Sequence, residues 1–210
     1  MSIKKPLHLV TQNDATNPIS DAEAEAAVRT LIEWIGEDPA REGLIETPKR
    51  YVKAWKEFFK GYKEDPRRHL HKTFKEVDGY KGPITLQNIR LETTCEHHLT
   101  PFVGEAFISY IPGNKVVGLS KLARLLEGYA KRMQIQERLT AQVANALFEE
   151  LEPRGVAVAI RSEHFCMSMR GAYRPGAQML TTTYLGDFES REDLRRDFMA
   201  VVNSERFRVL

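Results

Sequence analysis

Residues 103–129 have the sequence VGEAFISYIPGNKVVGLSKLARLLEGY, and its character changes twice along its length. Residues 103–111 are rich in aromatic and β-branched side chains, which predicts a strand. Pro112-Gly113-Asn114 predicts a turn, and Lys115-Val116-Val117 predicts a short further strand. From residue 119 to 129, apolar residues recur at the three- and four-residue spacing of one helix face. We therefore expect strand, turn, short strand and helix in immediate succession.

Further elements flank this stretch. Residues 139–151 predict a second helix, which Pro153 and Gly155 end. Residues 84–91, 156–160 and 179–185 predict strands, and 156–160 is a continuous apolar run typical of a buried strand. Ser190 and Asp193 are candidates to cap a final helix. Because strands and helices are grouped and do not strictly alternate, the order favours an α+β fold over a doubly wound sheet.

The N-terminal part has a different organisation. Residues 1–19 are polar without periodicity, which predicts a mobile arm. Ser20 and Glu23 form a capping-box pattern before a helix that ends near Gly36, and Thr47-Pro48 begins a second helix with an aromatic face. We interpret residues 20–75 as an N-terminal helical region and residues 76–210 as the catalytic domain.

Composition narrows the class of protein. The 210 residues include 31 basic and 29 acidic side chains, a net charge of +2 that gives no reason to expect nucleic-acid or membrane-surface binding. The N-terminus lacks a secretory pattern, and no apolar run approaches the roughly 18 residues that span a bilayer. We therefore expect a cytoplasmic protein whose two cysteines stay reduced.

Both cysteines lie in short segments that also contain histidine. Cys95 and His98 belong to the segment CEHH, and Cys166 closes the segment HFC. Thiolate and imidazole are the ligands that zinc prefers, and three protein ligands leave a fourth position for water, as in catalytic zinc sites. Cys95, His98 and Cys166 are thus a candidate metal set. The plain alternative is that Cys166 is an ordinary buried thiol.

Two histidines remain beside this set. His97 and His164 suit proton transfer, because histidine titrates near neutral pH. Either one can instead complete a closed four-ligand site. His69 and His71 lie in the charged stretch RRHLHK and are expected at a solvated surface, and His8 belongs to the N-terminal arm.

Anion-binding candidates gather before the helix that starts near residue 119. A helix N-terminus attracts phosphate, and Ser120, Lys121 and Arg124 add a hydroxyl and two charges there. A simple N-cap role explains Ser120 equally well. Arg170 can grip a phosphate or form a surface ion pair. Glu137 can accept hydrogen bonds from a guanine edge or merely favour the helix dipole.

Together these segments resemble the GTP cyclohydrolase I family over about residues 20–188. The resemblance rests on the following segments: Gly43-Leu44, residues 46–50 (ETPKR), 95–98 (CEHH), 110–112 (YIP), 117–124 (VGLSKLAR), 134–140 (QIQERLT), and 164–167 (HFCM) with Arg170-Gly171. Several motifs in the family's order and spacing are far more specific than any one of them. The tail at residues 207–210 has no counterpart in the family pattern.

The resemblance implies a fold, an assembly and a set of roles. The fold is the tunnelling fold, with helices packed on one face of an antiparallel sheet, and the assembly is a homodecamer with active sites between subunits. Cys95, His98 and Cys166 match the zinc ligands, and His97 and His164 match catalytic histidines. The residues matching substrate-binding positions are Gln136 and Glu137 for guanine, and Ser120, Lys121, Arg124 and Arg170 for the triphosphate.

The implied activity is hydrolytic opening of the GTP imidazole ring, with release of formate and formation of 7,8-dihydroneopterin triphosphate for tetrahydrofolate or another pterin. Attack at C8 of guanine would be assisted by His164 at N7, with His97 acting at the ribose stage. Two alternatives stay open. One is another enzyme of the same fold, such as a pterin synthase or a nitrile reductase, and the other is a nucleotide-binding regulatory protein with a structural zinc.

Overall fold

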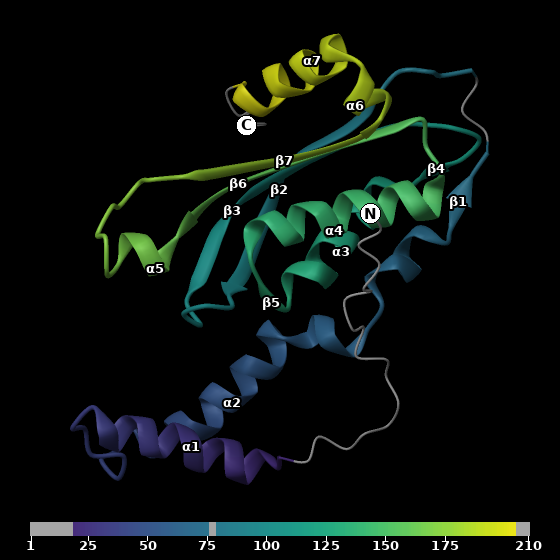
Figure 1. The fold of residues 1–210 in the computed structure, drawn as a ribbon. Coiled ribbons are helices and arrows are strands. Elements are labelled where there is room, and N and C mark those ends of the chain that lie inside the picture. The colour runs from purple at the N-terminus through teal and green to yellow at the C-terminus, as the bar shows by residue number, and fades with distance from the viewer. Residues whose placement is uncertain (1–18, 76–78, 205–210) are drawn as a thin grey trace, which may run out of the picture.

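The computed structural model describes residues 19–75 and 79–204 (Figure 1). The expected N-terminal arm lies outside the described residues except for its last position, and so do His8 and the tail at 207–210. Within the described ranges, no helix is both long enough and apolar enough to cross a membrane.

A five-stranded sheet organises the chain, in the order β5-β2-β3-β6-β7. Its strands are β2 (Ile84–Cys95), β3 (Pro101–Ile111), β5 (Met133–Gln134), β6 (Gly155–His164) and β7 (Met179–Gly186). Neighbouring strands are antiparallel, except that the short β5 runs parallel to β2. The predicted α+β class and the largely antiparallel sheet are confirmed, and the strand predicted at residues 84–91 continues to Cys95.

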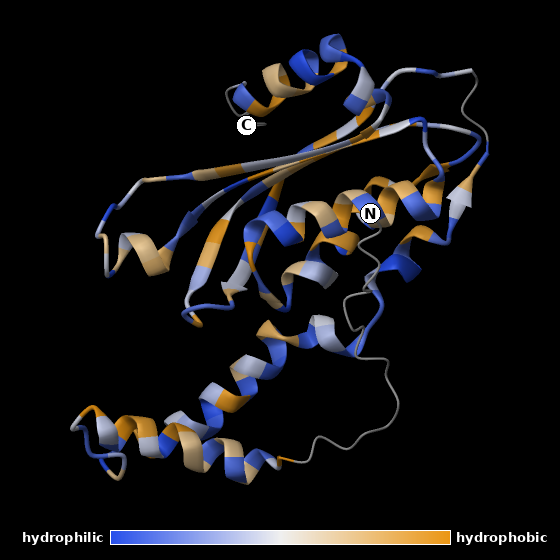
Figure 2. Cartoon of the chain, in the orientation of Figure 1, coloured by the Kyte–Doolittle hydropathy of each residue, from blue (hydrophilic) through white to orange (hydrophobic). Residues whose placement is uncertain are grey.

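Two helices cover one face of the sheet, α3 (Leu119–Ala130) and α4 (Gln136–Leu151) (Figure 1). Hydrophobic and hydrophilic residues mix along α4 (Figure 2), and buried hydrophobic residues of both helices form one core with those of the strands. The side chains of Leu125, Leu139, Val143 and Phe102 are fully buried in this core. Close packing here fixes the helices against the sheet and therefore fixes the start of α4, at Gln136.

The opposite face carries a smaller core. Phe107 of β3 and Ala159 of β6 pack there with Phe188 of α6 (Asp187–Ser190) and Phe198 of α7 (Glu192–Asn203). The expectation of helices on one face therefore describes α3 and α4, and α7 adds cover on the other face (Figure 1).

The capping expected for the last helix is wrong. The N-cap of α7 is Arg191, and no side-chain cap bond forms there among the described residues. Ser190 instead ends the preceding α6, and the Asp193 carboxylate accepts a hydrogen bond from the Arg191 side chain. The two residues expected to cap α7 therefore lie on either side of Arg191, where the chain passes from α6 to α7.

The N-terminal helices α1 (Asp21–Trp34) and α2 (Thr47–Phe58) contact each other (Figure 1). The predicted capping box is confirmed, because Ser20 and Glu23 exchange both of its hydrogen bonds. Two 3-10 turns follow, η1 (Lys60–Lys63) and η2 (Pro66–Leu70), and Leu70 enters the main core. The strands β1 (Thr73–Phe74) and β4 (Val116–Val117) pair with each other. Residues 60–74 thus contact α3, α4 and β4 of the main domain.

Candidate functional site

The segment CEHH forms a turn at the end of β2. Cys95 is the last residue of the strand, and its backbone N–H donates to the Thr100 carbonyl at 2.8 Å. Leu99 donates back to the Cys95 carbonyl at 2.9 Å and has a positive φ of 55°. This tight reversal leads directly into β3 at Pro101 and brings His98 over the Cys95 side chain, with the Sγ and Nδ1 atoms 3.9 Å apart.

Strand pairing brings the second segment to the same place. β3 lies between β2 and β6, so Thr94 pairs with Pro101 and Phe102 pairs with His164. His164 ends β6 and is the N-cap residue of the short helix α5 (Phe165–Ser168), which contains Cys166. Two segments far apart in the sequence therefore meet at one end of the sheet.

The ligand atoms of Cys95, His98 and Cys166 all lie within 4.8 Å of one another, and we name this group the Cys–His–Cys cluster. Both thiols are free, and Cys95 is only 7% exposed. Burial, followed by the neighbouring Cys95 thiol, raises the pKa of the Cys166 thiol. A bound cation reverses that preference, because metal ligation stabilises thiolates. Two thiolates and an imidazole fit a metal ion such as zinc.

The two remaining histidines occupy different environments. His164 is half-buried and stacks on the Phe102 ring with centroids 4.4 Å apart. Burial lowers the pKa of His164, and the Glu137 carboxylate opposes that shift through its charge. His97 is 64% exposed, and its Nε2 lies 4.0 Å from a carboxylate oxygen of Glu96. His164 is thus held by an aromatic partner, whereas His97 has a carboxylate neighbour.

Glu137 and Gln136 begin α4 close to this end of the sheet, but they point to different surroundings. Glu137 is exposed in the first turn of the helix. Gln136 is buried, and its amide nitrogen donates to the carbonyls of Ile160 and Met179 and to the Thr181 hydroxyl. Its amide oxygen accepts from the Ser162 hydroxyl at 2.6 Å. The Gln136 side chain therefore ties α4 to β6 and β7.

The triphosphate candidates separate into two places. Ser120, Lys121 and Arg124 are in the first two turns of α3, whereas β5, beside the CEHH turn, follows the other end of that helix. Twelve helical residues span about 18 Å. Arg170 is exposed just after α5, next to the Cys–His–Cys cluster in sequence. One chain therefore does not gather all four residues around the cluster.

The alternative role of Ser120 as an N-cap is wrong. Gly118 holds that position, and no side chain in the described residues caps α3 there. The cations at the start of α3 also affect the pKa of the nearby His69. Burial lowers the pKa of His69, the Glu64 carboxylate opposes that shift, and the cations of Arg68, Arg124 and Lys121 add to it.

The two histidines expected at a solvated surface differ. His71 is 64% exposed, and its Nε2 is 3.5 Å from Glu150. His69 is half-buried. Leu70, between them, is 1% exposed and belongs to the main core.

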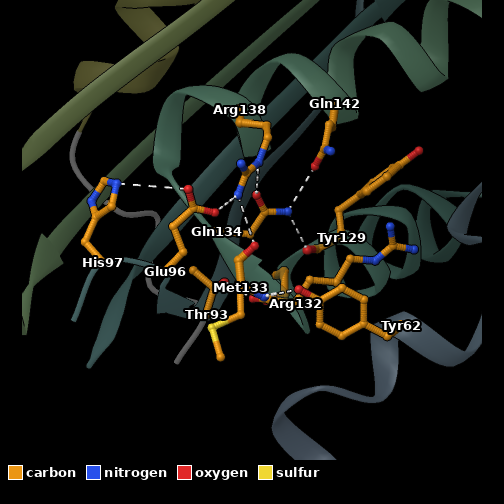
Figure 3. Close-up of polar contacts among 11 residues, drawn as sticks. Tyr62, Thr93, Glu96, His97, Tyr129, Arg132, Met133, Gln134, Arg138 and Gln142 are labelled. Atoms are coloured by element: carbon orange, nitrogen blue, oxygen red, sulfur yellow. Dashed lines mark hydrogen bonds and ion pairs between the residues drawn. The ribbon is translucent and has the colours of Figure 1, made fainter. Parts of the chain in front are cut away.

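A side-chain network next to the cluster was missed from the sequence (Figure 3). Arg138 of α4 forms an ion pair with Glu96 and donates to the Gln134 side-chain oxygen at 3.2 Å. The Arg138 guanidinium holds the pKa of the Glu96 carboxyl below its ordinary value. An opposite-charge pair across 42 residues has no local spacing pattern, so only the position of Glu96 inside CEHH pointed to it.

Comparison with known proteins identifies the family. The family model for GTP cyclohydrolase I matches residues 24–203. This chain belongs to the GTP cyclohydrolase I family. GTP cyclohydrolase 1 of Hyphomonas neptunium is 51% identical over 95% of this chain and 97% of its own length. GTP cyclohydrolase 1 of Maricaulis maris is 52% identical over 87% of this chain and 89% of its own length.

Among solved structures, the archaeosine synthase QueF-Like in the apo form has a TM-score of 0.43 and 19% identity, covering 51% of this chain and 96% of that one. Family membership makes the chain a hydrolase of the GTP cyclohydrolase I family, which catalyses the first step of pterin synthesis. The expected α+β fold, with helices packed on a largely antiparallel sheet, is the fold of the chain.

Proposed function

We propose that this chain catalyses the hydrolytic opening of the GTP imidazole ring, with release of formate and formation of 7,8-dihydroneopterin triphosphate. The observation that carries the proposal is the convergence of Cys95, His98 and Cys166 within 4.8 Å, beside His164. The family match over residues 24–203 and relatives of about 50% identity support the same chemistry.

The proposed metal is zinc, held by the Cys–His–Cys cluster. Two thiolates and one imidazole are a donor set that zinc prefers, and three protein ligands are typical of catalytic sites, which keep one position for solvent. When bound, zinc supplies Lewis-acid activation of the hydrolytic water. The chain's own contribution is to hold the three ligand atoms together at the end of the sheet.

His164 is the proposed proton donor to N7 of guanine. Its stacking on Phe102 fixes the plane of the ring, so the proton is presented in one direction. His97, which is exposed, is proposed to serve proton transfer at the ribose stage. Both assignments use side chains that flank the Cys–His–Cys cluster without needing to join it.

Glu137 is proposed to recognise the guanine edge. Its carboxylate is exposed at the start of α4 and acts on His164 through its charge, so the two side chains are near each other. A carboxylate matches the paired N–H donors of guanine and rejects adenine, which lacks them. Since the Gln136 amide has four intrachain partners, we propose that Gln136 aids guanine binding by positioning Glu137.

A shared site between subunits is proposed for the triphosphate. Ser120, Lys121 and Arg124 lie at the far end of α3 from β5, so the start of α3 in one subunit would serve the cluster of another. Arg170 would act from the cluster side. We propose that the chain forms a homo-oligomer, namely a homodecamer, in which each active site combines residues of neighbouring subunits.

We further propose that the enzyme works in the cytoplasm on GTP alone, without a nucleic-acid or membrane partner. The near-balanced charge of 31 basic and 29 acidic residues supports this.

The direct test is incubation with GTP and zinc, with formate and the fluorescence of the oxidised pterin as readouts. Cys166→Ser is expected to lose bound zinc and formate release together, because it removes one of three ligands. Full turnover by zinc-free Cys166→Ser protein would refute the metal role. Glu137→Ala is expected to lose the preference for GTP over ATP, and unchanged selectivity would show that the base is recognised elsewhere.

Mixing two inactive variants tests the shared site. Cys166→Ser lacks the cluster, and Lys121→Ala lacks part of the triphosphate end. A shared site is intact when its cluster comes from a Lys121→Ala subunit and its triphosphate residues come from a Cys166→Ser subunit. Random co-assembly in equal amounts therefore restores about a quarter of the sites. Activity that stays at the level of the separate variants would contradict sharing between subunits.

A further inference from the structure

Arg138 lies at the centre of a side-chain network between the start of α4 and the CEHH turn (Figure 3). Its guanidinium pairs with Glu96, donates to the Met133 carbonyl at 3.1 Å and donates to the Gln134 side-chain oxygen at 3.2 Å. The Arg138 side chain is only 25% exposed. Three acceptors in different directions leave the guanidinium one orientation, so it is pre-organised for Glu96.

Gln134 anchors this network in the core. It is 1% exposed, and its amide nitrogen donates to the Tyr129 carbonyl and the Gln142 side-chain oxygen, both at 2.9 Å. The amide oxygen accepts from Arg138, so both ends of the amide are satisfied. A fully bonded buried amide is rigid, so it restrains the Arg138 guanidinium that donates to it.

Glu96, which lies between Cys95 and His97 in the sequence, is restrained by this network. Its backbone N–H donates to the Gln134 carbonyl at 3.0 Å, which continues the pairing of β2 with β5. One carboxylate oxygen pairs with Arg138, and the other faces the Nε2 atom of His97 at 4.0 Å (Figure 3). Glu96 is therefore fixed at its backbone and at the carboxylate oxygen that pairs with Arg138, and its other oxygen faces His97.

We propose that Glu96 and Arg138 are positioning residues that hold the CEHH turn, and with it His97 and His98, against the start of α4 that carries Glu137. This inference rests on the proposed function and deepens it, because the distance between the Cys–His–Cys cluster and the proposed guanine-binding Glu137 is then fixed. Groups around a reacting centre lose effectiveness when their supporting contacts loosen, since productive geometry tolerates only small displacements.

An ordinary surface ion pair would not have this effect. Pairs between exposed side chains contribute little, because solvent screens them and both side chains stay mobile. The Arg154–Asp187 pair at the other end of the sheet, with an N–O distance of 2.7 Å, differs in its arginine, whose side chain is 51% exposed against 25% for Arg138. It supplies a matched control, because it also joins two elements through an arginine and a carboxylate.

The test compares Glu96→Gln, Arg138→Met, their double variant and Arg138→Lys with the control Asp187→Asn in the full-length zinc enzyme. Loss of a supporting contact around a metal site typically costs 10- to 100-fold. We expect each single variant to lower kcat by about 10-fold or more, with KM for GTP changed less than about threefold. The double variant is expected to be no worse than the poorer single variant, and Arg138→Lys to recover part of the loss.

Zinc release to a chelator is the second readout and needs no turnover. Glu96→Gln and Arg138→Met are expected to release zinc about 10-fold faster than the wild type, whereas Asp187→Asn releases it at the wild-type rate. If the wild type released no formate from GTP, the proposed function would fail, and the zinc half-lives would still decide the positioning role.

Three results would overturn the inference. They are wild-type zinc release in both single variants, effects on kcat that multiply in the double variant, and equal losses in Asp187→Asn. Glu96→Gln keeps the shape of the side chain, so a folded variant is available even if Arg138→Met is unstable. Circular dichroism of each variant checks this directly.

Discussion

Replacing Gln136 with leucine separates a structural role from a direct contact with guanine. Leucine keeps most of the volume and removes the amide, which makes four hydrogen bonds of 2.9, 3.1, 3.1 and 2.6 Å. A hydrogen bond contributes a net of about 0.5–1.5 kcal/mol, so four bonds give a loss of roughly 2–6 kcal/mol. The residue is 1% exposed, and the abandoned Ser162 hydroxyl has no access to bulk water, which favours the upper half of that range.

We therefore expect Gln136→Leu to lower the free energy of unfolding by about 5 kcal/mol, a large share of the roughly 5–15 kcal/mol of a typical domain. The assay is urea unfolding followed by far-ultraviolet circular dichroism. All proteins are compared at one protomer concentration, because stability of an oligomer depends on it. Gln178→Leu is the control, since Gln178 is an exposed glutamine just before β7.

A direct contact with guanine predicts the opposite pattern. In that case Gln136→Leu would weaken GTP binding while the free energy of unfolding stayed within about 1 kcal/mol of the wild type, as for an ordinary surface change. That result would refute the assignment of the Gln136 amide to the interface between α4, β6 and β7.

Three other perturbations have definite expected outcomes. Gly104→Ala places a Cβ 2.0 Å from the Arg161 carbonyl, so we expect separation of β3 from β6, a lower melting temperature and loss of bound zinc. Chelation of zinc is expected to lower the melting temperature of the wild type, because a ligand that binds the folded state stabilises it, and excess zinc restores it. The pKa of Glu23 is lowered by its bonds with Ser20, so this cap stabilises α1 above the unfolded pKa of about 4.3 and is lost as pH falls through the folded value. Ser20→Ala should accordingly speed hydrogen exchange in α1 about fivefold at pH 7, and the difference should shrink in acid, where only the bond from the Glu23 backbone N–H to the Ser20 hydroxyl remains to be lost.

Local patterns predicted the elements well because the governing forces are local. The Ser20 and Glu23 box forms as its spacing requires, and the apolar run from Val156 to Ile160 is fully buried. The Cys–His–Cys cluster was also predictable, because its residue types are rare elsewhere in the chain and suit one chemistry.

The exact residue at a helix cap was harder to predict where several neighbouring residues suit that position. Ser190 fits an N-cap by type, yet it ends α6, because the chain turns between two helices at Arg191. Ser120 fits a cap too, but Gly118 occupies that position. In both cases the tertiary path decides which of several suitable residues stands at the helix start, and one sequence contains no measure of that path.

The directions of polar side chains near the site were also not predictable from local sequence. Gln136 and Glu137 are adjacent and both polar, yet one is buried among three elements and the other is exposed beside His164. Their directions follow from how α4 packs on β6 and β7, which is a property of the whole sheet. Because the helix turns about 100° per residue, Glu137 points in a different direction from Gln136, and at this position that direction leads away from β6 and β7 to the exposed side of the helix start. The four hydrogen bonds of Gln136 fix the start of α4 on β6 and β7, and this packing sets the direction of the carboxylate proposed to select the substrate.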